Sequence, residues 1–312
     1  MEDITLGTDG AILPGKTNKI ALIDADTIAF AAASSTEYVS ELLPREMYTD
    51  SEWAEILVDP GYFEDSSGTQ LVYGTNIDEA TTRAMDKIEF ILDHTGCRDF
   101  SLHFTAGRES FRYTNVTPEY KANRLVDSQG AATRAPFGLY QLKQELCRQY
   151  PLKTKMWTAC EADDAVWMLG NRYRDKYLVC AVDKDILNAM EVPAFNYYSR
   201  AAYVHPKSGN NIEEIKMRFV EAENPTLWWY IQCLTGDPGD GIIGVKGIGP
   251  KKAWDILRPY KTDKERWDAI VQTYERYNRD VIDALLNMRM VRLDQYDPET
   301  NVLKLWSPKD LK

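Results

Sequence analysis

Residues 18–35, "NKIALIDADTIAFAAASS", set the fold class of this sequence. A short apolar run ends in Asp24 and Asp26, as expected of a buried parallel β-strand with carboxylates at its carboxyl end. The alanine-rich residues 27–35 that follow favour a helix. A strand that leads directly into a helix is the repeating unit of an α/β domain, so we predict that class.

The rest of the chain repeats this alternation and then becomes helical. Apolar residues at helical spacing over 76–96, ended by Gly96, predict a helix, whereas 44–75 shows few periodic signals and is expected to form a surface insertion. Strands are predicted at 99–107, 152–157, 176–185 and within 195–204, with a helix over 161–174. From about residue 215 the pattern is helical, before an extended, turn-rich tail. We therefore predict an α/β domain followed by a helical part.

Composition narrows the class of protein. With 312 residues and 44% hydrophobic residues the chain can bury a sizeable core, and it has no apolar run long enough for a transmembrane helix. The acidic, polar start lacks a signal-peptide pattern, and the five scattered cysteines have no metal-site spacing, so a cytoplasmic location is expected. The net charge of −11 argues against nucleic-acid binding unless the charges are segregated.

Positive charge is in fact concentrated between residues 108 and 148. Seven Lys and Arg residues lie there among Phe and Tyr residues, including Arg108, Arg112, Tyr120, Lys121 and Arg124. Basic residues interleaved with aromatic ones are typical of nucleic-acid binding, because the cations contact phosphates and the rings stack on bases. For the tyrosines of this segment a core role is an equally good interpretation.

Acidic residues fall into four groups, two of which follow predicted strands. Acids at a helix start are also favoured by the helix dipole, so any one group has an ordinary structural explanation. Together they would repel one another at one sheet edge unless cations neutralised them, and oxygen ligands suit Mg²⁺ or Mn²⁺. Two such ions could support phosphodiester hydrolysis. The nine candidate ligands are Asp24, Asp26, Glu161, Asp163, Asp164, Asp183, Asp185, Asp237 and Asp240.

The sequence gives weaker support for a nucleophilic triad or for a nucleotide-binding motif. The three histidines lie near no serine or cysteine signature, which argues against a nucleophilic triad. Residues 239–244 match GxGxxG, but they follow a helical segment and no βαβ unit surrounds them, so a dinucleotide site is not expected. The P-loop pattern fails because Pro250, not lysine, follows Gly249.

The stretch "GDGIIGVKGIGPKKAWDIL" (239–257) indicates an anion site. Glycines at 244, 247 and 249 allow a tight turn with backbone amides close to a ligand, and Pro250 begins a helix whose first turn carries two lysines. A DNA phosphate is the anion that best fits this arrangement. The alternative is a plain helix–turn–helix connection capped by glycine.

Five motifs together resemble the flap endonuclease and 5′→3′ exonuclease family, in particular the stand-alone 5′→3′ exonucleases of tailed phages. Residues 236–253 are similar to its helix–three-turn–helix motif, and "EADD" (161–164) and "VDKD" (182–185) to its later acidic motifs. "LIDAD" (22–26) resembles its first strand and "TPEYKANR" (117–124) the segment beside its helical arch. The motifs occur in family order over residues 20 to about 260.

The resemblance implies a PIN-like α/β fold, a central mostly parallel sheet flanked by helices, with a helical arch. It divides the chain into an N-terminal arm (1–18), a catalytic domain (19–205) with the arch at about 108–150, and a helical DNA-binding part (206–312) with the helix–three-turn–helix at about 226–258.

The resemblance also implies a ligand set. One Mg²⁺ or Mn²⁺ ion would lie among Asp24, Glu161 and Asp163. The second would be held by Asp164, Asp183, Asp185, Asp237 and Asp240. Lys121 would approach the scissile phosphate and Arg124 would steer it, while the hairpin carbonyls of some members bind K⁺. The expected DNA contacts are Arg108, Arg112, Tyr120, Gly244, Lys246, Gly247, Gly249, Lys251 and Lys252.

One position departs from the family pattern. The strand before the arch usually ends in aspartate, but here it reads "HFTAGRESFR", with Thr105 or Ala106 at that place. The first ion would then lack one ligand, to be compensated by Asp26 or by water.

These features lead to the prediction of a two-metal 5′→3′ exodeoxyribonuclease or flap endonuclease that acts near 5′ ends of duplex DNA, as a monomer, in phage replication, primer removal or recombination. One alternative is a PIN-class endoribonuclease or a nuclease for RNA–DNA hybrids. The other is a duplex-binding protein without catalysis, for which Thr105 is the best argument.

Overall fold

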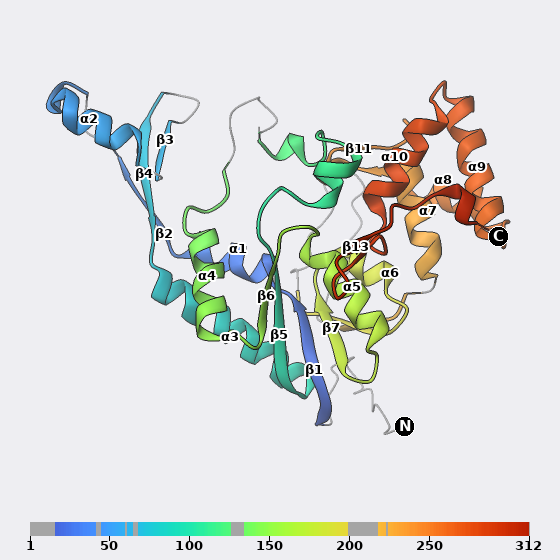
Figure 1. Ribbon diagram of the computed structural model, residues 1–312, viewed down its shortest axis with the longest axis horizontal. Helices are drawn as coiled ribbons and strands as arrows, with labels where there is room; N and C mark the ends of the chain where they lie inside the picture. Colours follow the sequence, from blue (N-terminus) through green and yellow to red (C-terminus); the bar gives the residue numbers. More distant parts are fainter. Residues whose placement is uncertain are drawn as a thin grey trace, which may run out of the picture.

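A computed structural model describes residues 16–41, 45–59, 61–64, 68–125, 134–198, 218–222 and 224–311 (Figure 1). Its centre is a six-stranded sheet in the order β6-β5-β1-β7-β8-β9, parallel except for β9. The strands are β1 (Thr17–Asp24), β5 (Cys97–Thr105), β6 (Thr154–Trp157), β7 (Tyr177–Ala181), β8 (Ala194–Asn196) and β9 (Arg218–Val220). The predicted mostly parallel α/β sheet is confirmed.

Alternate residues of β1 pack into two separate hydrophobic clusters, one on each face of the sheet. Ala21 and Ile23 face α1 (Asp26–Ser35), α3 (Ile77–Thr95) and α4 (Leu139–Gln149). Leu22 faces the opposite cluster, which contains α5 (Ala162–Arg172) and α6 (Lys184–Ala189). All three β1 side chains are fully buried, which explains the continuous apolar run in the sequence.

The C-terminal helices extend the second cluster. They are α7 (Pro225–Thr235), α8 (Pro250–Leu257), α9 (Asp263–Arg276) and α10 (Val281–Val291). Short hairpins β10–β11 (Gly236–Asp237, Ile242–Ile243) and β12–β13 (Tyr296–Asp297, Val302–Leu303) accompany them. In Figure 1 these helices form a separate layer beside α5 and α6, on the side opposite α3 and α4.

A second sheet, which we call the wing, projects from the α1–α3 side of the molecule (Figure 1). It has three antiparallel strands in the order β2-β4-β3, with α2 at its tip. Their bounds are β2 (Glu37–Glu41), α2 (Asp50–Leu57), β3 (Tyr62–Glu64) and β4 (Gln70–Thr75). The sequence predicted only an irregular insertion here, because the strands are short and half-exposed.

Three further predictions differ from the structure or lie partly outside its described residues. The described part of 108–150 contains a π-turn (Arg112–Val116), a 3₁₀ turn (Ala122–Leu125) and α4, which packs on α1 and α3, and the arch itself stays a prediction. Residues 218–220 pair with β8 as a strand instead of continuing a helix. Residues 1–15 of the predicted arm, 126–133 of the predicted arch and 199–204 lie outside the described residues.

Among the described residues no helix combines the length and the apolar character needed to span a membrane.

Candidate active site

The acidic residues gather where the central parallel strands end. Asp24 is the last residue of β1, which lies between β5 and β7, and Asp183 follows β7 by two residues. Burial, followed by the charges of Asp26 and Asp183, raises the pKa of the Asp24 carboxyl to about 8. The three carboxylates are therefore close enough to repel one another.

A lysine and a glutamine bind the carboxylates beyond β7. Asp183 caps α6 and accepts the Asp185 amide at 2.6 Å, so Asp185 lies in a helical turn and not in the extended segment that the sequence predicted. Lys184 donates to Asp237 at 2.5 Å and to Asp185 at 3.2 Å, and Gln232 donates to Asp185. Burial and the charge of Asp183 raise the pKa of Asp185 to about 6.

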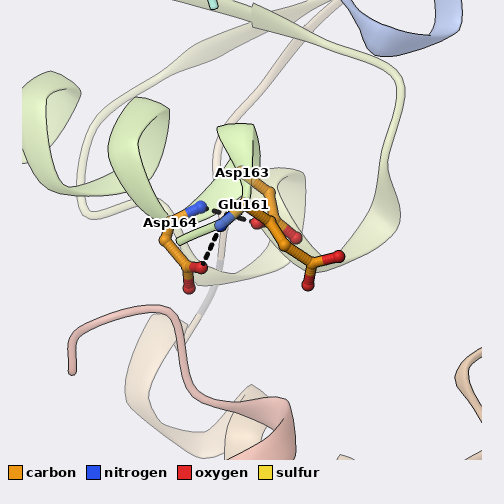
Figure 2. Close-up of side chains that lie close together, drawn as sticks. All are labelled: Glu161, Asp163 and Asp164. Atoms are coloured by element: carbon orange, nitrogen blue, oxygen red, sulfur yellow. Dashed lines mark hydrogen bonds between the residues drawn. The ribbon is translucent and has the colours of Figure 1, made fainter. Parts of the chain in front are cut away.

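The start of α5 carries the second acidic group. Glu161 caps the helix, and oxygen atoms of Glu161, Asp163 and Asp164 lie within 4.8 Å of one another. Figure 2 shows the side chains of Glu161 and Asp163 extending to one side of the helix start and that of Asp164 to the other. Burial, then the charges of Asp164 and Glu161, holds the pKa of Asp163 well above its usual value. Of the three, Asp163 is half-buried, whereas Glu161 and Asp164 are buried.

The Asp164 carboxylate forms an ion pair with a buried arginine. Arg112 is 1% exposed and donates two hydrogen bonds of 2.7 Å to the Asp164 carboxylate, and it also donates to the Met290 and Arg292 carbonyls. Although burial opposes it, the charge of Asp164 holds the pKa of Arg112 well above its usual value. The predicted DNA contact of Arg112 is therefore wrong, because its guanidinium is buried and donates its hydrogen bonds to groups inside the protein. Asp164, which the resemblance grouped with Asp183, Asp185 and Asp237, is paired with Arg112 and accepts the Glu161 amide.

Lys121 and Arg124 lie beside Glu161 and Asp240. Lys121 forms an ion pair with Glu161 and lies 3.8 Å from Asp240, which is itself paired with Arg124. Although burial alone would lower it, Glu161 and Asp240 raise the pKa of Lys121, so the lysine stays charged. These contacts bring Asp240, predicted as a ligand of the second ion, close to Glu161, predicted as a ligand of the first.

Tyr120 holds the carboxylates of Glu161 and Asp240 by hydrogen bonds. It is 4% exposed, and its hydroxyl donates to Glu161 at 2.8 Å and to Asp240 at 3.1 Å. It also lines the cavity described below, and its contact with DNA stays a prediction.

Thr105 joins three elements at the tip of β5. Its amide donates to Asp26 at 3.1 Å, its hydroxyl accepts the Ala162 amide at 2.9 Å, and its carbonyl accepts Lys143 at 2.8 Å. Lys143 also forms a 2.7 Å ion pair with Asp26. The Asp26 carboxylate therefore lies at the strand tip where the sequence lacks an acid.

Lys143 is a site residue that the sequence analysis did not single out. It lies 8% exposed on α4, on the same face as the buried Leu142 and Leu146. A lysine on the apolar face of an amphipathic helix is the signal that could have identified it, because a buried ammonium needs a partner.

A cavity of about 640 Å³ opens beside these residues. On the side of the acidic cluster its lining includes Asp26, Thr105, Arg108, Lys121, Lys143 and Glu161. The cavity therefore gives access to carboxylates from both acidic groups.

The predicted glycine turn connects α7 to α8. A Cβ on Gly244 would lie 2.2 Å from the Thr235 carbonyl carbon, so only glycine fits there, and Gly247 has a φ of +79°. Gly249 caps α8 and Pro250 is its first residue, as predicted. Lys246, Gly247, Gly249, Lys251 and Lys252 are all exposed. The turn presents an amide-rich, positively charged surface.

Arg279 braces this turn from the loop before α10. Its guanidinium donates to the Ile243 and Gly244 carbonyls, both at 2.7 Å, and pairs with Asp283. These two carbonyls already have a cationic partner within the chain.

Comparison with known proteins gives relatives in sequence and in fold. No family model matches the chain. The flap endonuclease of Escherichia phage T5 is 28% identical over 169 residues, covering 49% of this chain and 53% of that protein. The 5′-3′ exonuclease of Bacillus subtilis is 25% identical over 181 residues, covering 54% and 60%.

The fold also matches a solved structure. T5 5′-exonuclease with divalent zinc ions bound superposes with a TM-score of 0.52 at 17% identity, covering 88% of this chain and 89% of that one. In sequence, the chain spans about half the length of the first curated relatives that it matches. In sequence this chain is similar to flap endonucleases and 5′-3′ exonucleases, and in fold it is similar to T5 5′-exonuclease.

Proposed function

We propose that this protein is a divalent-metal-dependent nuclease that hydrolyses phosphodiester bonds near the 5′ end of duplex DNA. The observation that carries the proposal is the gathering of Asp24, Asp26 and Asp183 at the ends of β1 and β7, with Glu161, the neighbour of Asp163, lining the same cavity as Asp26. The names of the T5 and Bacillus relatives support the same reaction class.

The donor set fits Mg²⁺ or Mn²⁺, because every candidate ligand is a carboxylate oxygen. Asp24, Glu161 and Asp163 would hold one ion, and Asp183, Asp185 and Asp237 a second. Bound ions of this kind neutralise phosphate oxygens and lower the pKa of water. We do not extend the proposal to K⁺ at the Ile243 and Gly244 carbonyls, because Arg279 binds both.

The chain's own residues would orient the substrate. Lys121, kept charged by Glu161 and Asp240, would contact the phosphate at the acidic cluster. Arg124, more exposed and paired with Asp240, would contact the same strand. Lys246, Lys251 and Lys252 would hold the duplex backbone at a distance from the reaction, without reading its sequence.

The test uses duplex DNA labelled at its 5′ or 3′ end, with Mg²⁺ or with chelator, beside an Asp183→Ala variant. Early release of short 5′-labelled products by the wild type, lost with chelator and in the variant, is the expected result. RNA–DNA hybrids and RNA duplexes of the same sequence serve as parallel substrates. Faster cleavage of either would assign the protein to the RNA-directed alternatives instead.

A further inference from the structure

The loop between α9 and α10 packs against the glycine turn, and the proposed hydrolysis gives this loop no role. The loop reverses at Asn278, which has a φ of +55°, and the Arg279 amide then donates to the Tyr274 carbonyl at 3.0 Å. Tyr277 accepts a hydrogen bond of 2.7 Å from Lys252 in the first turn of α8. The same loop therefore contacts the turn through Arg279 and the helix after the turn through Tyr277.

Three hydrogen bonds from inside the chain reach the two carbonyls at the start of the turn. One terminal nitrogen of Arg279 donates to both carbonyls, and the Asn287 side chain donates to that of Ile243 at 2.8 Å. Asn287 is buried and also donates to the Tyr274 hydroxyl at 2.7 Å. A free cation could bind this carbonyl pair only by displacing the guanidinium, so the K⁺ that the resemblance implies does not fit there.

The guanidinium of Arg279 is held on its other sides as well. Its Nε lies 3.0 Å from the Asp283 carboxylate, and its central carbon lies 5.1 Å from the centre of the Tyr274 ring. The side chain is only 25% exposed. A guanidinium is always charged and is more weakly hydrated than an ammonium, so it can lie against carbonyls without a shell of water. Arg279 therefore supplies one fixed positive charge at the turn.

The two carbonyls lie at a sharp bend of the backbone. Neighbouring carbonyls of an extended strand point to opposite sides, whereas the Ile243 and Gly244 oxygens both lie 2.7 Å from the same nitrogen of Arg279. Their partial negative charges therefore face the same point, and a cation placed there stabilises the bend. Because the exposed Lys246 and Gly247 follow shortly after, we expect the bend to set the shape of the DNA-binding surface.

We propose that Arg279 is a positioning residue for the DNA-binding turn, and that its guanidinium does there what a bound monovalent cation would do. The proposal rests on the proposed function, in which the turn holds the duplex backbone. The duplex affinity of this protein should then not depend on which monovalent cation is in solution. Removal of the Arg279 side chain should leave an open carbonyl pair, and backbone carbonyls are ligands that K⁺ binds.

The experiment measures affinity for a blunt DNA duplex in chelator, so that no hydrolysis occurs, in KCl or in choline chloride at the same ionic strength. The variants are Arg279→Ala and, as the conservative change, Arg279→Lys. Arg276→Ala is the matched control, because it removes one exposed positive charge from the last turn of α9, close in sequence to the loop. Thermal unfolding of each protein is measured in the same two salts without DNA.

For the wild type we expect affinities in the two salts that agree within about twofold. Arg279→Ala should bind about tenfold more weakly in choline chloride, because it loses charged hydrogen bonds, and KCl should restore most of the loss. Arg279→Lys and Arg276→Ala should stay within about threefold of the wild type in both salts. In thermal unfolding, KCl should raise the Tm of Arg279→Ala by about 2 °C over choline chloride and leave the wild-type Tm unchanged.

A wild-type affinity that is clearly higher in KCl than in choline chloride would overturn the proposal, because a cation site would then exist beside Arg279. Wild-type affinity of Arg279→Ala in choline chloride, or an equal loss of its affinity in both salts, would also overturn it. Absence of duplex binding by the wild type would instead reject the proposed function. The Tm comparison would still decide the role of Arg279 in that case, since it needs no DNA.

Discussion

Lys121 has a backbone conformation that lysine rarely adopts, with φ at +56°. Its amide donates to the Asp240 carbonyl at 2.9 Å, which holds the strained turn in place, and its ammonium faces Glu161. Strain maintained by surrounding contacts is often found at functional sites. The sequence motif predicted Lys121 as catalytic, and this conformation gives it a fixed direction.

We expect Lys121→Ala to lower the rate of DNA hydrolysis by about 100-fold, the typical effect of removing one stabilising group. Affinity for duplex DNA should change little, since the exposed lysines of the hairpin supply other contacts. Single-turnover cleavage and binding in chelator measure the two quantities. Lys304→Ala is the control, because Lys304 is an exposed lysine that directly follows β13. A loss of binding as large as the loss of rate would contradict a role at the reacting phosphate.

Arg112 is the residue whose sequence assignment was most misleading. It lies in a basic segment, but the fold encloses it between Asp164 and the carbonyls of Met290 and Arg292. Local sequence could not show this, because the partners are 52 and 178 residues away. Such an arginine stabilises the protein through its network, and leaving Asp164 unpaired in the core would be costly.

We expect Arg112→Met to lower the free energy of unfolding by about 3 kcal/mol, measured by urea denaturation. Arg148→Met, which breaks an exposed pair with Glu145, should leave the free energy of unfolding nearly unchanged. If the Arg112 variant kept its stability and instead lost affinity for DNA, the original assignment of this arginine would be right.

The buried carboxyl of Asp24 makes stability depend on pH when divalent ions are removed. Its folded-state pKa of about 8 lies above the unfolded value, so the folded protein binds the extra proton between about pH 4 and pH 8. Stability from this group is present below pH 4 and is lost as the pH rises to 8. In chelator, Tm should fall across this window, and Asp24→Asn should flatten the decline. An equal slope in the variant would exclude Asp24 as the cause.

At the scale of elements, the glycine turn and α8 form a surface that is independent of the acidic cluster. Lys251 and Lys252 lie in the first turn of α8, beyond the Gly249 cap. Contacts of this kind with phosphates raise affinity through counterion release and carry no sequence preference.

The double variant Lys251→Ala/Lys252→Ala should weaken duplex binding and reduce the slope of log K against log salt by about 2. Lys264→Ala is the matched control, because Lys264 is an exposed lysine of the neighbouring helix α9, paired with Asp268. An unchanged slope would mean that these two lysines do not contact phosphates, and the turn would be an ordinary connection between helices.

Elements with strong periodic signals were predictable from the sequence. The fully buried β1, α3 with its Gly96 cap, and α8 with Pro250 at its start appear at the predicted places. The wing was missed because β3 has three residues and its register is set by pairing with β4. The arch was expected from resemblance alone, and residues 126–133 at its middle lie outside the described part of the chain.

Like the fold, the site has a part that the sequence predicts and a part that it does not. Strand ends and the helix cap bring Asp24, Asp183 and Glu161 to the sheet edge, which follows from the α/β topology. The pairing of Asp164 with Arg112 and of Asp240 with Arg124 is a further feature of the site. Those pairings join segments distant in sequence, so no local pattern contains them.

At the scale of the whole molecule, the predicted division into residues 19–205 and 206–312 crosses one hydrophobic cluster. Leu22 of the sheet and Val166 of α5 belong to the same buried cluster as Tyr230, Ile270 and Trp306. Phe111 stacks on Tyr296 with ring centres 6.5 Å apart. The C-terminal helices thus complete the core of the α/β part instead of forming a separate one.

We therefore expect the full chain without metal to unfold in a single calorimetric transition, with the van't Hoff enthalpy equal to the calorimetric one. A fragment ending at residue 222 should fail to fold cooperatively, because it would expose the apolar face of α5 that α7 and the C-terminal segment cover. Circular dichroism recorded during heating measures the cooperativity of unfolding of the fragment. Two separate transitions in the full chain, or a cooperative transition in the fragment, would show instead that the two parts fold independently and that the predicted domain boundary is real.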